Sequence, residues 1–100
     1  MNDYILLMHD NATDVAASED SEKWGKYISA LRGSGQFDGG SSIGKGESLR
    51  IGQPPYAAET RITGFIRVRA ADLEDAKSFL QSNPVYEAGG TVEVRELPQD

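Results

Sequence analysis

The segment RITGFIRVRA, residues 61–70, constrains the fold more than any other part of the chain, because its apolar and polar side chains alternate. A period of two residues indicates a β-strand whose two faces meet different surroundings. The side chains divide into two sets that point in opposite directions: Ile62, Gly64, Ile66 and Val68 against Thr63, Phe65, Arg67 and Arg69. This is the clearest strand of the sequence, and the other elements have to be arranged around it.

Two segments have the spacing of amphipathic helices, and the first is SEDSEKWGKYISALRGSG, residues 18–35. Apolar residues recur there at the i, i+3, i+4 and i+7 positions that share one helix face: Trp24, Tyr27, Ile28 and Leu31. Ser18 or Ser21 is the expected N-cap, and Gly33 or Gly35 the expected end.

The second helical segment, ADLEDAKSFLQSNP, residues 71–84, follows the clearest strand directly. Asp72 is its expected N-cap, and Asn83 followed by Pro84 should end it. Its apolar stripe consists of Leu73, Ala76, Phe79 and Leu80. A helix with such a stripe is expected to cover one face of the sheet.

Further strands are expected on both sides of these helices. Residues 4–9 form a short apolar run before a turn-rich stretch, and TVEVREL, residues 91–97, alternates again. Two weaker strands, 36–43 and 48–52, flank a glycine-rich hairpin. GQPPYAAE, residues 52–59, should be a loop because two adjacent prolines forbid regular strand pairing.

This order of elements predicts an α+β fold with the ferredoxin-like βαββαβ arrangement, in a single domain that spans residues 1–100. Two helices would cover one face of a four-stranded antiparallel sheet and leave the other uncovered. The uncovered face should hold a mixture of apolar and charged side chains: Ile5, Leu7, Phe65, Leu97, Arg67, Arg69, Glu93 and Arg95. This face is too apolar to remain exposed to solvent and too charged to be an ordinary hydrophobic core. We therefore predict a homodimer with a partly polar cavity between two sheets. The alternative is that the arginines pair with Glu93 and solvate an edge.

The charge balance excludes several partner classes. The formal net charge is −6 and the isoelectric point is about 4.7, so phosphates of nucleic acids and anionic membrane surfaces would be repelled. The chain has no cysteine, which excludes disulfides and thiolate zinc sites and is typical of a cytoplasmic protein. The apolar run of residues 4–8 is too short to cross a membrane, and no basic segment precedes it.

The stretch GGSSIGKGES, residues 39–48, matches the opening of a phosphate-binding loop. Such a loop needs a Ser or Thr after its lysine and a helix directly afterwards. Here Gly46 follows Lys45, and the chain continues as ESLRIGQPP toward two prolines. We therefore expect an edge strand and a mobile glycine-rich hairpin near the cleft, and no nucleotide site.

A series of short stretches is distributed along most of the chain, in this order: YILLMH, ALRGSGQFDGG, Gly64-Phe65, ADLEDAKSF, NPVYEAGG and VEVREL. In this combination they resemble the YCII-related, or DGPF-domain, group of small bacterial proteins. The resemblance implies a dimeric α+β barrel, in which two ferredoxin-like sheets face each other around a cleft. The wider superfamily includes small lyases, isomerases, monooxygenases and dehydrochlorinases.

Two features depart from the pattern of that family. Members with a proposed active site pair a histidine on the first helix with an aspartate, and the corresponding position here is Trp24. The DGPF signature is also absent, with Pro55-Tyr56 as its nearest counterpart. The resemblance makes Asp38 the candidate for the acidic partner and leaves catalysis open. Trp24 itself is expected in the core between helix and sheet.

His9 is the only histidine of the chain, and histidine is the residue type that exchanges protons near neutral pH. Strand alternation places it on the face of Ile5 and Leu7, on the expected cleft side. There it could act as a general base or acid oriented by an acidic neighbour, with Asp10 beside it. Alternatively, it is a strand-end residue that is hydrogen-bonded to a loop.

Arg67, Arg69 and Arg95 should project toward one region of the cleft, where guanidinium groups would attract a carboxylate or phosphate. Tyr86 could point its hydroxyl into the same cleft or pack on the end of the second helix. No metal site or cofactor-binding motif is recognisable.

The sequence thus predicts a homodimer with a cleft for a small anionic or aromatic metabolite. If the protein is an enzyme, the expected step is proton abstraction or elimination, with His9 as the base and an arginine that stabilises the developing negative charge. The alternative is a non-catalytic dimeric module for interaction or ligand binding.

Overall fold

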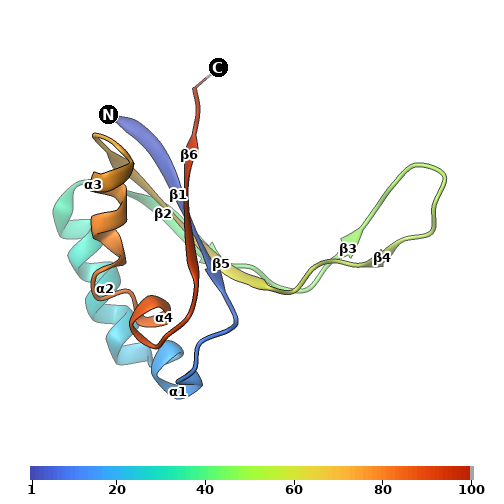
Figure 1. Ribbon diagram of the computed structural model, residues 1–100, viewed down its shortest axis with the longest axis horizontal. Helices are drawn as coiled ribbons and strands as arrows, with labels where there is room; N and C mark the ends of the chain where they lie inside the picture. The colour runs from blue at the N-terminus through green and yellow to red at the C-terminus, as the bar shows by residue number, and fades with distance from the viewer. Residues whose placement is uncertain (100) are drawn as a thin grey trace.

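The computed structural model describes residues 1–99, and Asp100, the last residue of the expected domain, lies outside the described part. Its centre is a four-stranded antiparallel sheet with the strand order β2-β5-β1-β6 (Figure 1). The strands of this sheet are β1 (Asn2–His9), β2 (Phe37–Ser42), β5 (Ile62–Ala70) and β6 (Val92–Leu97). The protein is therefore of the α+β class, as predicted. The strand order is compatible with a ferredoxin-like arrangement, because β5 inserts between β1 and β2.

The helices lie together on one face of this sheet (Figure 1). They are α1 (Val15–Ser18), α2 (Ser21–Ser34), α3 (Leu73–Lys77) with the 3₁₀ turn η1 (Ser78–Leu80), and α4 (Pro84–Glu87). The opposite face, which we call the open face, is covered by no helix of residues 1–99. Within the same residues, no helix combines the length and apolar character that crossing a bilayer requires.

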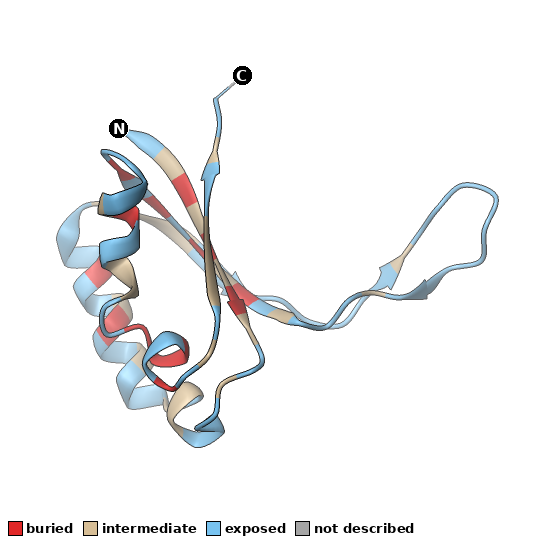
Figure 2. Cartoon of the chain, viewed as in Figure 1, coloured by how far each residue is buried: buried red, intermediate tan, exposed pale blue. Residues whose placement is uncertain are grey.

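The hydrophobic core lies between the helices and the sheet, where the buried residues gather in Figure 2. Alternate residues of the two central strands point into it, and both Leu6 and Val68 are fully buried. Tyr27 and Leu31 of α2 pack against them, as the helical spacing predicted. Burial of a leucine or valine side chain stabilises the fold by about 1.5–3 kcal/mol, so this layer holds α2 on the sheet.

The start of α2 differs from the expectation that Ser18 or Ser21 caps it. Asp20 is the N-cap, and its Oδ1 accepts hydrogen bonds from the backbone N–H of Glu22 at 2.9 Å and of Lys23 at 3.1 Å. A carboxylate is favoured there because it also interacts with the positive end of the helix dipole. Ser18 belongs to the unpredicted short helix α1. The predicted end is confirmed, since Gly35 adopts the left-handed conformation with φ of 74°.

The second helical segment is shorter than expected. Asp72 caps it as predicted, but the helix tightens into η1, and Leu73, placed in the apolar stripe, is exposed. Asn83 and Pro84 do not simply end this helix, because together they start α4. The fully buried Asn83 side chain accepts hydrogen bonds from the backbone N–H of Val85 and Tyr86, and Pro84 occupies the first turn.

Residues 43–61, which we call the arm, form a long hairpin that projects from the rest of the chain, the body (Figure 1). The predicted strand at 48–52 is wrong, because pairing is limited to β3 (Glu47–Ser48) and β4 (Tyr56–Ala57). The two prolines lie in the turn between β3 and β4, as the expected loop at residues 52–59 requires. Only β4, at the end of that segment, forms strand pairs. The prediction of an edge strand is confirmed by the place of β2 in the sheet. Its pairing with β5 shifts register around Gly39, which has a φ of 95°.

Candidate functional site

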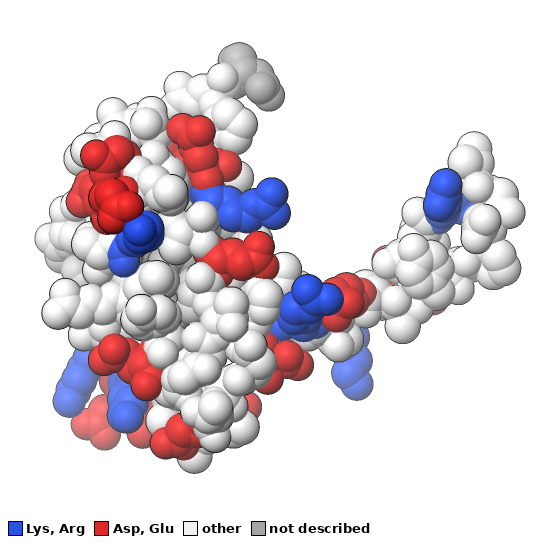
Figure 3. All heavy atoms as spheres, in the orientation of Figure 1, with Lys and Arg blue, Asp and Glu red and all other residues white. Residues whose placement is uncertain are grey.

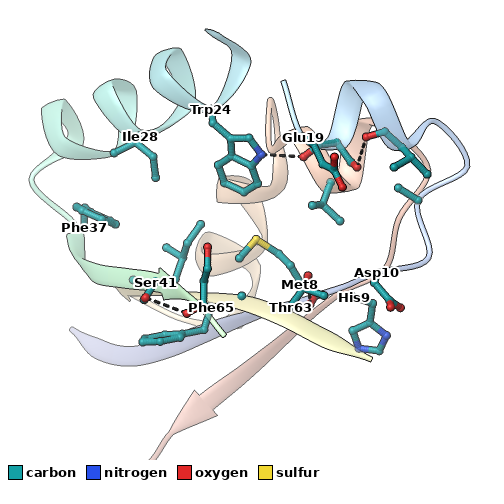
Figure 4. A pocket seen from close by; sticks show the side chains of 18 of the residues that line it. Met8, His9, Asp10, Glu19, Trp24, Ile28, Phe37, Ser41, Thr63 and Phe65 are labelled. Carbon is teal, nitrogen blue, oxygen red and sulfur yellow. Dashed lines mark hydrogen bonds between the residues drawn. The ribbon is translucent and has the colours of Figure 1, made fainter. Parts of the chain in front are cut away.

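A cavity of about 590 Å³ opens between α2 and the end of the sheet at β2 (Figure 4). Its apolar walls come from four separate elements of the fold: Met8 of β1, Val15 of α1, Trp24 and Ile28 of α2, and Phe37 of β2. In Figure 4 Trp24 and Ile28 border the space from the helix side, Phe37 borders it from the start of β2, and Met8 points into it from the sheet. Cavities of this size lined by apolar and aromatic side chains are typical of small-molecule sites.

Two glycines on neighbouring strands leave this space unfilled. Gly40 and Gly64 occupy positions on the helix-facing side of the sheet, where Ile66 and Val68 fill the core farther along β5. A Cβ at Gly40 would lie 2.5 Å from the carbonyl oxygen of Phe65, so close strand approach requires glycine there. A Cβ at Gly64 would come only to 3.2 Å from the terminal methyl of Met8, which can move. Gly64 is thus the position where a larger side chain could enter the cavity.

Trp24 is held firmly at the edge of the cavity. Its indole Nε1 donates a hydrogen bond of 2.8 Å to the carbonyl oxygen of Ser18, and its ring meets Tyr27 edge-on at a centroid distance of 5.8 Å. Tyr27 in turn donates to the carbonyl oxygen of Phe79 at 2.6 Å. Burial raises the pKa of Tyr27 above its ordinary value of 10.0, and a hydrogen bond with the Asn83 side chain opposes part of that rise. Trp24 therefore packs on the core, as predicted, and also lines the cavity.

Polar groups line the rest of this cavity. Arg32 of α2 supplies a cation, while Asp10 and Glu19 supply carboxylates. Hydroxyl groups of Ser42 and Thr63 lie near the end of the sheet. A site with an apolar interior and a few charged groups suits a ligand that combines a ring with a polar or charged substituent. Among residues 1–99 no group of three or more His, Asp or Glu side chains is placed to hold a metal ion.

The open face carries the arginines that the alternation placed together. Three rows of side chains cross it on β5, β1 and β6: Phe65, Leu7 and Glu93; Arg67, Ile5 and Arg95; Arg69, Asp3 and Leu97. This face carries equal numbers of basic and acidic side chains, three arginines against Asp3, Asp38 and Glu93.

Asp38 lies with two of these arginines. Its carboxylate is 3.5 Å from an Nη of Arg67 and 3.8 Å from an Nη of Arg69, and Arg69 also lies 3.8 Å from Asp3. The arginine side chains are 45% and 61% exposed, so the ion pairs are worth less than about 1 kcal/mol each. Among residues 1–99, Arg95 has no carboxylate within 4.0 Å, and it remains free to meet an anion.

His9 is paired with a carboxylate that the sequence reasoning did not assign to it. Its Nε2 lies 2.6 Å from Oε2 of Glu93, and the imidazole is only 11% exposed. Glu93 on the edge strand β6 therefore pairs with His9, whereas Asp38 on the opposite edge strand β2 pairs with arginines. Leu7 pairs with Glu93, and His9 lies two residues after Leu7 on the same strand face, within reach of the Glu93 carboxylate. This strand register could not be inferred from the sequence.

Tyr86 is separated from these groups. It lies on α4 in the helix layer, with about half of its surface exposed, whereas the arginines and His9 project from the open face. The structure thus brings together Arg67, Arg69 and Asp38, and separately His9 and Glu93.

The chain matches no protein-family model and no curated protein. The likeness to the YCII-related group therefore stays a prediction that rests on the quoted stretches. Function has to be inferred from the cavity beneath α2 and from the open face.

Proposed function

We propose that this protein is a homodimer that binds a small aromatic molecule with an acidic substituent, in the cavity between α2 and the sheet. The observation that carries this proposal is the cavity of about 590 Å³ with glycines in its floor and Trp24, Phe37 and Met8 around it. A flat ring can lie against glycine backbone and contact the indole and the thioether sulfur. Arg32, in the last turn of α2, offers the acidic group a partner, whereas the carboxylates of Asp10 and Glu19 come from the chain before that helix begins.

A homodimer with facing sheets, in a ferredoxin-like dimeric barrel, is supported by the open face. Ile5, Leu7, Phe65 and Leu97 form half-buried apolar rows there that no helix covers. Its charges balance, although the whole chain has a formal net charge of −6. Two such faces can approach without the repulsion that other surfaces of this acidic protein would produce.

Trp24 gives a direct readout of ligand binding, because it is the only tryptophan of the chain and borders the cavity. Titration with benzoate, salicylate and indole-3-acetate should change its fluorescence saturably. Gly64→Leu should weaken binding at least about tenfold by filling the cavity, since 1.4 kcal/mol of lost contact corresponds to that factor. Gly25→Leu is the matched control, because nothing lies within 4 Å of a Cβ at that helix position. Equal binding by the two variants, or no saturable change with any probe, would contradict the proposal.

The dimer has a separate test on the open face. Ile5→Asp replaces an apolar side chain between Arg67 and Arg95 with a carboxylate. The dimer interface would lose an apolar contact, and it would have to bury a further charged group. Sedimentation velocity should show a dimer for the unaltered protein and for Ser29→Asp on the exposed side of α2, and a monomer for Ile5→Asp. A stable monomer of 10.8 kDa for the unaltered protein at micromolar concentration would rule the dimer out.

The pair of His9 and Glu93 favours a second candidate function, acid–base catalysis in the cleft between two sheets. His9, held by Glu93 at 2.6 Å, would take a proton from a C–H bond. The electron pair would stay on the substrate, where the arginines of the open face stabilise the negative charge. NMR in D₂O with phenylpyruvate, which has an acidic C–H bond next to its carbonyl group, should then show faster proton-for-deuterium exchange than in buffer alone, and His9→Gln should remove the difference. Faster exchange that survives the substitution would exclude His9 as the base.

A further inference from the structure

The arm exposes large apolar side chains to an unusual degree. Leu49 is 76% exposed, Tyr56 is 59% exposed, and Ile51 at the tip is 101% exposed. No residue of the arm is classed as buried. Ile43, at the base of the arm, is exposed as well. Single exposed apolar residues are ordinary, but four within one hairpin form the kind of surface that marks an interaction site.

The arm also lacks the contacts that could support it alone. Its strands pair over two residues each, and few other backbone hydrogen bonds join its sides, among them one of 3.0 Å from Ala58 N–H to the carbonyl oxygen of Gly46. An isolated two-stranded hairpin is at best marginally stable in water. A contact outside its own body is therefore needed to hold the arm in an extended shape.

Charge identifies what that contact can be. The arm carries Lys45, Arg50 and Arg61 against Glu47 and Glu59, a net charge of +1. Because the whole chain carries −6, the rest of it carries −7. Arg50 is the only charged residue at the tip, whereas acidic groups are spread over the body (Figure 3). An acidic body is the surface that attracts this arm, and a second copy of the chain supplies one.

The position of the arm agrees with a second copy as the partner. The arm extends directly from β2 and β5, two strands of the open face, and leads away from its own body (Figure 1). When two open faces meet across a two-fold axis, each arm extends beside the other subunit, and every contact occurs twice.

We propose that the arm is a clasp that docks on the body of a second copy, with Ile51 and Leu49 as its apolar anchors. The clasp rests on the proposed homodimer and adds to it a contact surface separate from the open face. Docking on a second copy accounts for the exposed apolar tip of the arm, its net positive charge and its few internal contacts.

Substitutions at the tip test the clasp without disturbing the fold, because the replaced side chains contact nothing in the body. Ile51→Asp and Leu49→Asp should each raise the dimer dissociation constant by about 10- to 100-fold, as expected for losing one buried aliphatic anchor. Gln53→Asp adds the same charge at the tip and should change it by less than about threefold. Dimerisation that is equally strong in all these variants would overturn the clasp.

A cross-link identifies where the arm docks. Because the chain has no cysteine, Gln53→Cys, which leaves both anchors in place, can be labelled uniquely with a photo-reactive benzophenone. In a mixture of ¹⁵N-labelled and unlabelled protein, the clasp predicts cross-links between isotopically different chains that join the tip to body peptides. Cross-links confined to one chain would contradict it.

The two assays separate the possible failures. If Ile5→Asp dissociates the dimer and the tip variants do not, the clasp is wrong and the homodimer stands. If the unaltered protein is a monomer, both are wrong, and ligand binding at Trp24 remains a separate question.

Discussion

The body and the arm are joined through β2 and β5, but they differ in how far their apolar side chains are buried. In the body, β5 alternates strictly, and α2 and the other helices cover its apolar side. In the arm, beyond the ends of β2 and β5, the chain has no helix above it and its apolar side chains are exposed. The body is therefore stabilised by its own contacts, whereas the arm has few of its own, and we propose that a second copy of the chain supplies them.

The largest contrast should come from equivalent leucine truncations in the two regions. Leu6→Ala in the body should lower the free energy of unfolding by about 2–5 kcal/mol, because it leaves a cavity in a fully buried layer. Leu49→Ala in the arm should cost less than about 0.5 kcal/mol when both are measured in the Ile5→Asp monomer. Urea unfolding followed by Trp24 fluorescence measures both values, and a similar cost at the two sites would remove the distinction between body and arm.

Glycine substitutions should repeat the contrast at a smaller scale. Gly40→Ala forces a Cβ against the Phe65 carbonyl oxygen and should destabilise the protein by about 1–3 kcal/mol. Gly44→Ala meets no atom within 4 Å and lies at the base of the arm, so its melting temperature should stay close to that of the unaltered protein. Calorimetry on the two variants checks this, and an equal loss at Gly44 would show that the arm is packed.

Alkaline pH should weaken the body through Tyr27. Burial raises the pKa of Tyr27 in the folded state, so its neutral form stabilises the fold below pH 10. That stabilisation is lost as pH rises from about 10 through the higher folded pKa, because the unfolded tyrosine ionises first. Urea midpoints at pH 8 and pH 11 should fall less for Tyr27→Phe than for the unaltered protein. The same decline in both would exclude Tyr27 as its source.

The smallest effect is expected on the open face. Asp38→Asn removes the carboxylate shared by Arg67 and Arg69, and should change the unfolding free energy of the Ile5→Asp monomer by less than about 1 kcal/mol, because the side chains are largely solvated. Urea unfolding at low and high salt measures the change. A loss of several kcal/mol would show that this network supports the fold itself.

Most of the body could be predicted from the sequence, because its signals are periodic. The alternation of residues 62–70, the stripe of α2 and the cap at Asp72 each follow from local spacing, and the structure has them. The second helical segment was overextended because its tightening into η1 and the start of α4 depend on the buried Asn83 side chain. Local spacing does not report such a tertiary contact.

The candidate site was less predictable than the fold. The faces of Asp38 and the arginines follow from alternation, but the contact between His9 and Glu93 depends on strand register. The cavity exists because Gly40 and Gly64 have no side chains to fill it. From the sequence alone, a glycine inside a strand can indicate either a less stable strand or the floor of a pocket. The short pairing of β3 and β4 was missed because the surrounding glycines and prolines mask it.

Hydrogen–deuterium exchange tests most directly the proposal that the body binds a ligand and that the arm binds a second copy. We expect indole-3-acetate to slow exchange in β2 near Gly40 and in β5 near Gly64, and dilution below the dimer dissociation constant to speed exchange only in residues 43–61 and on the open face. If the exchange rates in the arm are the same at all protein concentrations, and the ligand slows exchange at no amide around the cavity, both the clasp and the ligand site are wrong.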